Sequence, residues 1–587
     1  MRFLELKNKW FIWPLFLFLF GYIILRAWFV QPILDELGTL YWYIQTGQVI
    51  GGSAVMDTNN HFLNTFVAKW MYGLFGDHFF GFRLLAMASF PIYFFSTKTF
   101  IQRSIDKNFA WIIFIAINTV PWITDYFSLC RGYGPSLAFF LAAFCLFQTW
   151  IRKQNWKLFG CFIALLIITL FSNLSLLVPT FILFSYSIFL FVINRKKIEG
   201  KLPSLLFILA FMAFLVPVYI YLNKLKKAGA LWWGSRDGLW EVTGKSLARN
   251  TLFTEHEIWK YIFIALFVLL SVLLILALLK HKLTDLIQKE LFWVTAIFAG
   301  SLLSAILMAV FLQVNYPMDR VGMYLVPLFI LVIGLLFSQN RYLRWLLLAL
   351  IWFPVSFVWK LNLMTSVFSP EDRIHTEFYT SIKEIIKDDK FCSSDYVMHV
   401  IYAYSSRKDK VQHLLSEFNG DTTALGEYHL SWLGGAPSTN YEPVLKDRIT
   451  ATTLFKRKTP FNRVFIKDTL ISYINSRDFS ITLCELNLDG KYKNIQADVS
   501  SSVQVDKPIL NTNLSYELFE KDSVSSYFQG TRFDCYFGGK TKYKFRMVSQ
   551  PYVIKPNDKK FVVFMRNNTK EHVVMRNVRV KLFGVSY

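Results

Sequence analysis

Long apolar runs follow one another through the first two thirds of the chain. A helix rises about 1.5 Å per residue, so a run of roughly 20 residues crosses a hydrocarbon layer about 30 Å thick. The first run, WFIWPLFLFLFGYIILRAWFV, is followed by no small-residue cleavage site, and we expect it to remain as a span. The other predicted spans lie at about 80–100, 109–127, 132–150, 157–172, 175–193, 203–222, 258–279, 290–311, 321–338 and 343–362. The pattern predicts a polytopic α-helical membrane protein with about eleven transmembrane helices.

Other parts of the chain depart from this pattern. The loop 31–78 between the first two spans holds two amphipathic stretches, and we expect interfacial helices over about 35–45 and from about residue 60 onward. We therefore expect a membrane domain over 1–363. Residues 364–490 mix helix-like and short apolar stretches, which predicts an α/β subdomain. Residues 491–587 alternate apolar and polar positions, which predicts a β-rich subdomain with β-sandwich strands.

Basic residues concentrate in alternate loops between the predicted spans. Lys and Arg near span ends are retained on the cytoplasmic side, which predicts a cytoplasmic N-terminus and an extracytoplasmic C-terminal domain at the plasma (inner) membrane. Much of the net charge of +23 then reflects topology and gives no reason to expect nucleic acid as a partner. The outward loop 223–257 is an exception, because it is rich in Lys and Arg, and it predicts an anionic partner.

Composition narrows the class of protein further. The chain has 587 residues, of which 54% are hydrophobic and 18% aromatic, more than a soluble globular domain carries. Three of the six cysteines, Cys392, Cys484 and Cys535, fall in the outer domain, so at most one disulfide is expected there. No C-x-x-C spacing occurs, so the sequence gives no sign of a structural zinc site.

Polar residues that an apolar environment does not explain gather in the predicted outward loops. Each has a structural reading: Asp35 as a helix N-cap, the arginines as side chains that reach toward headgroups, and His61 as a hydrogen-bonded core residue. Each also has a functional reading, because carboxylates and guanidinium groups at one membrane face are suited to acid–base chemistry and phosphate binding. These residues are Asp35, Glu36, Asp57, Asn59, Asn60, His61, Asp125, Arg131, Tyr133, Asp319, Arg320 and Tyr324.

Five short motifs occur in order along these loops. They are Asp-Glu at the start of the first loop, D-x-N-N-H before a helix, LFGDHFFGFRLL at the second span, R-G-Y after the third and D-R-x-x-x-Y-L-x-P near the last spans. Together they resemble the GT-C superfamily of membrane glycosyltransferases, in the branch of protein O-mannosyltransferases and the bacterial lipid A aminoarabinose transferase. The resemblance covers about residues 1–360. The membrane region has no large insertion, which favours a bacterial envelope enzyme.

The resemblance implies transfer of a sugar from a polyprenyl-phosphate donor to a hydroxyl of an envelope glycan, lipid or protein, on the extracytoplasmic face and with inversion. Asp35 matches the family's catalytic acidic position and would be the general base, with Glu36 orienting it and Asp57 as a second carboxylate. Donor phosphate would be bound by Arg131 and Arg320, with Lys245 and Arg249 as second choices. Substrate contacts would come from Asn60, His61, Tyr133 and Tyr324. Some branches use a divalent cation, for which Asp57 and His61 are the candidate ligands; the sequence does not require one.

Other functions remain open from the sequence. A ligase or polymerase acting on lipid-diphosphate oligosaccharides would use the basic loop 223–257 for additional phosphate contacts. A transporter or flippase would show inverted repeats and charges near mid-membrane. An inactive relative whose outer domain binds cell-wall glycan is a further alternative.

Overall fold

The computed structural model divides the chain into two compact units, which are described separately. The helical unit comprises Met1–Val30 and Gln48–Phe368, and the β-rich unit comprises Gln31–Gly47 and Ser369–Tyr587. The structure describes residues 6, 8–45, 47, 49, 56–76, 78–194, 198–231, 233–280, 288–338, 340–386, 392–417, 426–506, 512–520, 524–532, 534–537, 540–568 and 570–586.

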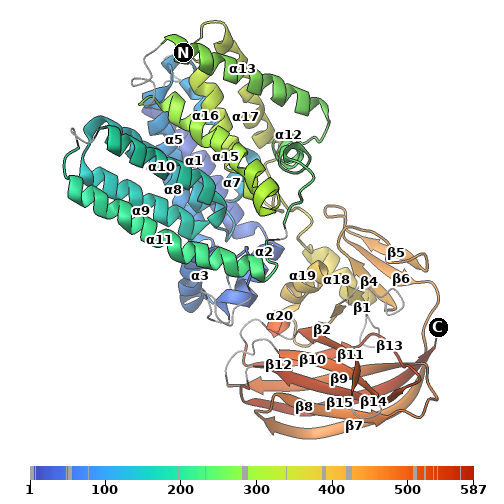
Figure 1. Cartoon of the computed structure of the whole chain (residues 1–587). Coiled ribbons are helices and arrows are strands. Elements are labelled where there is room, and N and C mark those ends of the chain that lie inside the picture. Colours follow the sequence, from blue (N-terminus) through green and yellow to red (C-terminus); the bar gives the residue numbers. More distant parts are fainter. Residues whose placement is uncertain are drawn as a thin grey trace. The chain divides into compact units, whose positions relative to one another are not determined.

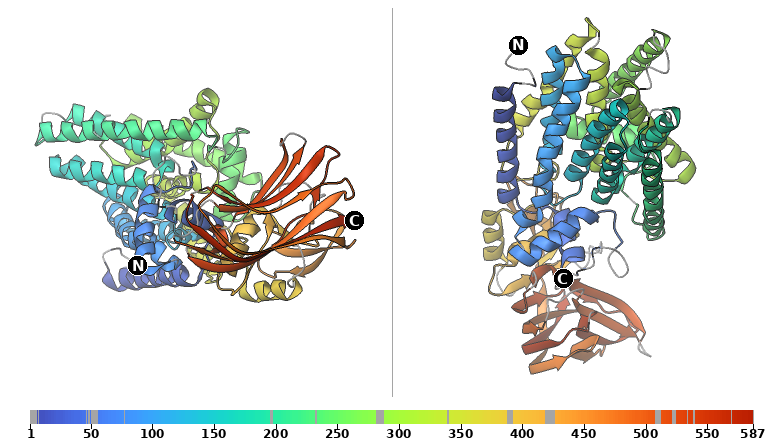
Figure 2. Two further views of the ribbon diagram at one scale, coloured as in Figure 1. Left: turned by 90° about the horizontal axis from the view of Figure 1, so that it is seen from below. Right: turned by 90° about the vertical axis from the view of Figure 1, so that its left-hand side faces the viewer.

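The helical unit consists of long helices that lie alongside one another, joined by short helical turns (Figures 1 and 2). Its helices are α1 (Lys9–Phe29), α3 (Phe62–Phe75), α4 (Phe79–Phe82), α5 (Leu84–Ser104), α6 (Lys107–Asn118), α7 (Pro121–Asp125), α8 (Tyr133–Lys153), α9 (Trp156–Ser172), α10 (Leu177–Ile193), α11 (Lys201–Lys227), α12 (Lys245–Leu252), α13 (Ile258–Lys280), α15 (Glu290–Leu312), α16 (Leu325–Phe337) and α17 (Trp352–Trp359). The helical turns include η4 (Trp240–Gly244), η5 (Asp319–Gly322) and η6 (Leu343–Ile351).

Seven helices in the described part of the chain are long and apolar enough to cross a membrane. They are Lys9–Phe29, Leu84–Ser104, Tyr133–Lys153, Leu174–Ile193, Lys201–Lys227, Glu290–Leu312 and Asp319–Phe337. Three spans expected from the sequence correspond to shorter apolar helices, Lys107–Asn118, Trp156–Ser172 and Leu343–Trp359, whereas the span expected at 258–279 corresponds to α13, Ile258–Lys280. One cause of shortening is visible at α6, which ends at Asn118 just before Pro121 begins α7. The helical membrane part is confirmed in this coarse form, whereas the number eleven and the orientation stay predictions.

Aromatic side chains fill the centre of the helical unit. Trp293 of α15 is fully buried and meets Phe100 of α5 and Phe144 and Phe147 of α8, with ring centroids 5.7, 4.9 and 5.2 Å away. All three contacts are edge-to-face, the geometry that the ring quadrupoles favour. This cluster joins three long helices that are far apart in the sequence.

The β-rich unit contains helices and three sheets. Its helices are α2 (Leu34–Thr39), which continues as the π-helical turn η2 (Leu40–Ile44), and α18 (Thr376–Ile385), α19 (Tyr396–Ser406) and α20 (Asp534–Phe537). Its strands are β1 (Cys392–Ser394), β2 (Gln412–Leu414), β3 (Ser416–Glu417), β4 (Tyr428–Ser431), β5 (Tyr441–Lys446), β6 (Thr453–Arg457), β7 (Asn462–Ser476), β8 (Ser480–Asn487), β9 (Asn494–Val505), β10 (Thr512–Glu520), β11 (Ser525–Arg532), β12 (Lys542–Val548), β13 (Tyr552–Val553), β14 (Asp558–Asn567) and β15 (Val573–Ser586).

The sheets form a small α/β part and a β-sandwich, as the sequence predicts. The α/β part has the strand order β3-β1-β4-β6-β5, with β1 parallel to both β3 and β4. The sandwich pairs a four-stranded sheet, β11-β10-β14-β8, with a six-stranded sheet that follows β2-β12-β9-β15-β7 and adds β13 beside β9. Tyr516 of β10 stacks on Tyr552 of β13 at 5.3 Å, so the two sheets face each other (Figure 2).

Two details of the outer domain differ from the expectation. The run YVMHVIYAY, expected among short strand-like stretches, lies in α19, where Asp395 occupies the N-cap position and residues 398–403 are all buried. The sandwich begins at Asn462 with β7 rather than near residue 491, since β7 pairs with β15 and β8 with β14. β7 shows no clear alternation between buried and exposed residues. Such an alternation would have marked it as a sandwich strand.

Both expected helices of the first loop are present. The first is α2 with η2, but Ile33, not Asp35, is the N-cap residue. The backbone N–H of Ile33 donates to Glu36 Oε2 at 3.1 Å, so the acid at the third helical position caps the helix. The second is α3, whose N-cap is His61. Its aromatic side chains Phe66 and Trp70 are 50% and 65% exposed, and an interfacial location of this helix stays a prediction.

Candidate functional site

Asn59 brings together two arginines from distant parts of the helical unit. Asn59 lies in the turn before α3, Arg131 in the loop between α7 and α8, and Arg320 in η5. Its side-chain oxygen accepts from an Arg131 nitrogen at 2.8 Å and from an Arg320 nitrogen at 3.4 Å, and its carbonyl accepts from Arg131 at 3.3 Å. Three motifs separated by up to 261 positions therefore meet at one side chain. We call Asn59, Arg131 and Arg320 the arginine cluster.

Aromatic rings surround the two guanidinium groups. Arg320 lies over the rings of Trp233 and Phe368, at 4.9 and 5.7 Å from their centroids, and Arg131 lies 5.9 Å from the Tyr133 ring. Arg131 is fully buried and Arg320 is 9% exposed. The positive charges thus lie in an environment where water screens them little, and an anion placed there would interact strongly.

His61 borders the arginine cluster and is held neutral. Its ring meets the Tyr133 ring edge-to-face at 4.8 Å. Burial lowers the His61 pKa well below the ordinary value of 6.5, and the charges of Arg131 and Arg320 lower it further, while only the backbone of Ser172 raises it. In the described part of the chain, His61 Nε2 has no hydrogen-bond partner. Its imidazole is therefore a neutral group beside two cations.

The R-G-Y motif explains how His61 reaches this position. A Cβ on Gly132 would lie 1.9 Å from the carbonyl oxygen of Ser172 and 2.8 Å from the Cβ and Cγ atoms of His61. A side chain at this position would displace the end of α9 or the imidazole. Glycine is needed here for close approach, since its φ of −77° is accessible to any residue.

Asp57 and Asn60 shape the turn that carries Asn59. Asp57 Oδ1 accepts from the backbone N–H of Asn59 at 3.0 Å, an Asx turn. Asn60 is buried and donates from its side chain to the carbonyl of Val49 at 2.8 Å, while its oxygen accepts from Thr65 Oγ1 at 3.1 Å. Both residues fix backbone next to the arginine cluster.

The remaining predicted residues of the helical unit lie outside the arginine cluster. Tyr324 is buried just before α16. In the described part of the chain, it makes no hydrogen bond or ring contact with the arginine cluster. Lys245 pairs with Glu241 and Glu257, at 2.5 and 2.6 Å.

Arg249 supports the turn that carries Arg320. Its guanidinium bonds Glu255 at 3.1 Å and Asp319 Oδ1 at 2.8 Å, and Asn250 also donates to Asp319 Oδ1. Asp319 has a φ of 51°, and its backbone N–H donates to Ser246 Oγ. α12 therefore holds η5, which places Arg320.

Asp35 and Glu36 belong to the β-rich unit. Glu36 Oε2 is used in the cap of α2, and the N–H of Leu34 donates to Asp372 Oδ2 at 3.3 Å. The guanidinium of Arg407, at the end of α19, lies 4.9 Å from the Tyr41 ring. These contacts fix α2, with Asp35 in its first turn, to the β-rich unit.

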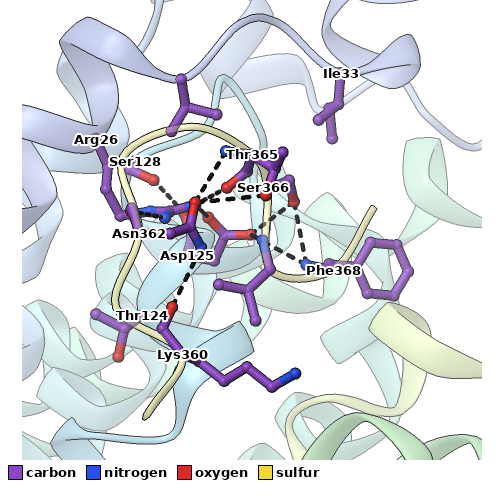
Figure 3. A network of polar contacts seen from close by, with 12 residues as sticks. Arg26, Ile33, Thr124, Asp125, Ser128, Lys360, Asn362, Thr365, Ser366 and Phe368 are labelled. Atoms are coloured by element: carbon purple, nitrogen blue, oxygen red, sulfur yellow. Dashed lines mark hydrogen bonds and ion pairs between the residues drawn. The ribbon is translucent and has the colours of Figure 1, made fainter. Parts of the chain in front are cut away.

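Asp125, expected among the functional polar residues, forms a structural ion pair with Arg26 of α1, a residue that the sequence analysis did not single out (Figure 3). Both side chains are fully buried. The Asp125 carboxylate also accepts from Ser366 Oγ and Val367 N at 2.7 Å and from Phe368 N at 3.3 Å. The sequence held one signal of this ion pair: Arg26 lies in the last turn of the first span, and a buried charge requires a partner.

Arg26 completes this network by donating to carbonyls of the same segment. Its NH1 donates to the carbonyl of Asn362 at 2.6 Å and its NH2 to that of Thr365 at 2.9 Å. The ion pair therefore fixes the chain after α17 up to Phe368, whose ring contacts Arg320. Asp125 therefore supports the arginine cluster by holding the segment that carries Phe368, and it is not itself a member of the cluster.

In the described part of the chain, no group of three or more His, Cys, Asp or Glu side chains is arranged to hold a metal ion. None of the six cysteines forms a disulfide within the described residues.

Neither a family model nor a curated protein matches the chain. Among solved structures, it is similar to the cryo-EM structure of arabinosyltransferase EmbB from Mycobacterium smegmatis, with 11% sequence identity and a TM-score of 0.33. The match covers 97% of this chain and 64% of that one, so the chain spans less than two thirds of that protein's length. At this TM-score, the function has to be argued from the chain's own residues.

Proposed function

We propose that the chain is a membrane glycosyltransferase that takes a sugar from a polyprenyl-phosphate donor and transfers it to an acceptor hydroxyl on the extracytoplasmic face, with inversion. One observation carries the proposal: Asn59 holds the buried guanidinium groups of Arg131 and Arg320 together. Three of the motifs behind the resemblance to GT-C glycosyltransferases supply these residues.

The arginine cluster suits a phosphate leaving group. As the glycosidic bond breaks, negative charge grows on the phosphate oxygens, and two pre-placed guanidinium groups stabilise it without reorganisation. Arginine also offers paired N–H groups that match phosphate oxygens. Loss of one such contact costs about 3 kcal/mol of transition-state stabilisation, or about a hundredfold in rate. Because phosphate leaves readily, no general acid is required.

The assignment of the general base rests on the resemblance. The base must take the proton of the acceptor hydroxyl as it attacks the anomeric carbon. Glu36 already accepts the N–H of Ile33 and Asp57 that of Asn59, so each carboxylate has a structural task. Because Asp35 matches the catalytic acidic position of the family that the chain resembles, we assign the base to Asp35, with Glu36 holding the helix that carries it.

The second-choice residues and the divalent cation fit less well. Lys245 and Arg249 are engaged with carboxylates. His61 is a poor cation ligand here, because the charges of Arg131 and Arg320 act on it and would repel a metal ion as they repel a proton. We therefore derive no step through a metal.

The test is transfer of a labelled sugar from polyprenyl-phosphate donors to extracted envelope glycans by the purified protein in lipid. Asp35→Asn should abolish transfer and keep donor binding, whereas Arg131→Gln should weaken donor binding. Arg152→Gln is the matched control, since Arg152 lies in the last turn of α8, about 30 Å along the helix from Tyr133, and pairs with Glu290.

Equal transfer by wild type and Asp35→Asn would remove Asp35 from the base role. Unchanged donor binding by Arg131→Gln would remove the arginine cluster from the donor site. Failure of the wild type to bind any polyprenyl-phosphate sugar would contradict the proposed function as a whole.

A further inference from the structure

The outer face of the six-stranded sheet carries a regular arrangement of serines and cations. Along β9, Val499 and Val503 point into the sandwich and are buried, so Ser500 and Ser502 lie on the opposite face. Strand register sets their neighbours: Ser502 pairs with Lys544 on one side and Arg576 on the other, and Ser500 pairs with Arg546 and Arg579. We call these six residues the serine–cation face.

Geometry makes this face a shallow trough. Directly paired residues on one sheet face have Cβ atoms about 5 Å apart, so each serine lies between two long side chains about 10 Å apart. The serines are two residues apart, so the arrangement repeats after about 7 Å along the strand. A small hydroxyl between long cationic side chains leaves room for a single extended chain lying along β9.

The charge of this face is strongly positive. Lys542 and Lys581 lie on the same face and add to its four cations, against the two carboxylates Asp468 and Asp498. These carboxylates pair with Arg579 and Arg546, each at 2.7 Å. In the described part of the chain, Lys542, Lys544, Arg576 and Lys581 form no ion pair.

Groups suited to sugars accompany the cations. The hydroxyls of Ser500 and Ser502 make no hydrogen bond within the described residues. Tyr473 of β7 continues the row of Lys544, Ser502 and Arg576, and its ring is 52% exposed with Arg576 at 6.0 Å. Hydroxyls that can donate and accept, next to an exposed aromatic ring, match a polyhydroxylated chain.

We propose that the serine–cation face binds an acidic glycan, a linear sugar polymer that carries carboxylate or phosphate groups. Its anions pair with the cations on both sides of the trough, and its hydroxyls bond Ser500 and Ser502. An anionic membrane surface fits less well, because it would meet the tips of the Lys and Arg side chains and not the serines between them. The proposal is independent of the glycosyltransferase assignment.

The experiment measures binding of oligogalacturonate, with uncharged dextran as reference, to the full chain in nanodiscs of neutral lipid. Lys544→Gln/Arg576→Gln should weaken binding about tenfold and reduce its salt dependence. Ser502→Tyr fills the trough without changing the charge, is compatible with a strand, and should weaken binding similarly. The matched control is Lys446→Gln/Lys456→Gln, which removes two exposed cations from β5 and β6 of the α/β part.

Saturable, salt-sensitive binding that both face variants weaken and the control retains would support the proposal. No binding by the wild type, or equal binding by wild type and Ser502→Tyr, would overturn it. A membrane-docking role would also overturn it. In that case, the chain in nanodiscs would bind separate vesicles containing phosphatidylglycerol through Lys544 and Arg576, and oligogalacturonate would not bind.

Discussion

Truncating Asp125 removes the carboxylate at the centre of the buried network in Figure 3. In Asp125→Ala, the guanidinium of Arg26 keeps its bonds to two carbonyls but loses its only carboxylate partner in the described part of the chain. Ser366 Oγ and the backbone N–H groups of Val367 and Phe368 lose their acceptor as well. A buried charge and several donors are then left without compensation.

The magnitude follows from these losses. Breaking a buried ion pair by removing one partner costs about 3–5 kcal/mol, and each unsatisfied buried N–H adds about 1 kcal/mol or more. We therefore expect Asp125→Ala to lower the free energy of unfolding by about 4 kcal/mol or more. The double variant Arg26→Met/Asp125→Leu leaves no buried charge and should cost much less, about 2 kcal/mol, because apolar replacement of a whole pair is often nearly neutral.

The assay is equilibrium unfolding of the purified protein in micelles for wild type, Asp125→Ala, the single variants Arg26→Met and Asp125→Leu, and the double variant. A native protein is stable by only about 5–15 kcal/mol, so the expected loss is a large part of the total. Destabilisation of less than about 1 kcal/mol by Asp125→Ala would refute the reasoning. A double variant that loses as much as the sum of the singles would refute the coupling.

Three further predictions concern single residues. The folded-state pKa of His61 lies well below the unfolded value of about 6.5, so only the unfolded state binds this proton on acidification. His61 should therefore lower the free energy of unfolding by about 1 kcal/mol between about pH 6.5 and 5.5. Unfolding measured across this range should show that His61→Gln removes this loss. Gly132→Ala should lower the free energy of unfolding by about 1–3 kcal/mol, because the new Cβ meets the Ser172 carbonyl. Gly21→Ala, which has open space around it, should not destabilise the protein. Thermal unfolding of both variants checks this prediction, and equal stability of the two would contradict it. Glu36→Ala removes the acceptor in the α2 cap and should cost about 1 kcal/mol, visible as faster hydrogen exchange in α2; unchanged exchange would exclude this cap role.

Periodicity in the sequence was sufficient for the broad architecture. Runs of about 20 apolar residues predict helices, and strict alternation predicts strands, because these two periods reflect backbone geometry. β7 lacks alternation in its exposure, and α19 is buried at six consecutive positions, 398–403, so neither shows the period of its own class. Their assignment depended on tertiary neighbours that a single sequence does not reveal.

The candidate site was predictable in part. Arg131 and Arg320 were conspicuous as charges at span ends, and the structure brings them together. Asn59, which joins them, was expected among the polar residues of the first loop but without a functional role, because an amide before a helix has an ordinary capping role. The partners of Asp125 are Arg26 and residues 366–368, about 100 and 240 positions away, and pattern reasoning has no access to such contacts.

The central claim is that the arginine cluster binds the phosphate of a lipid-linked sugar. The most direct test of this claim is the affinity of sugar-free polyprenyl monophosphate for the purified full chain. This affinity is compared between wild type, Arg131→Gln/Arg320→Gln and the control Arg152→Gln. The account predicts saturable binding by wild type and control, and binding weaker by about a hundredfold in the double variant, since two charge-assisted contacts are lost. Equal affinities in all three proteins would contradict it.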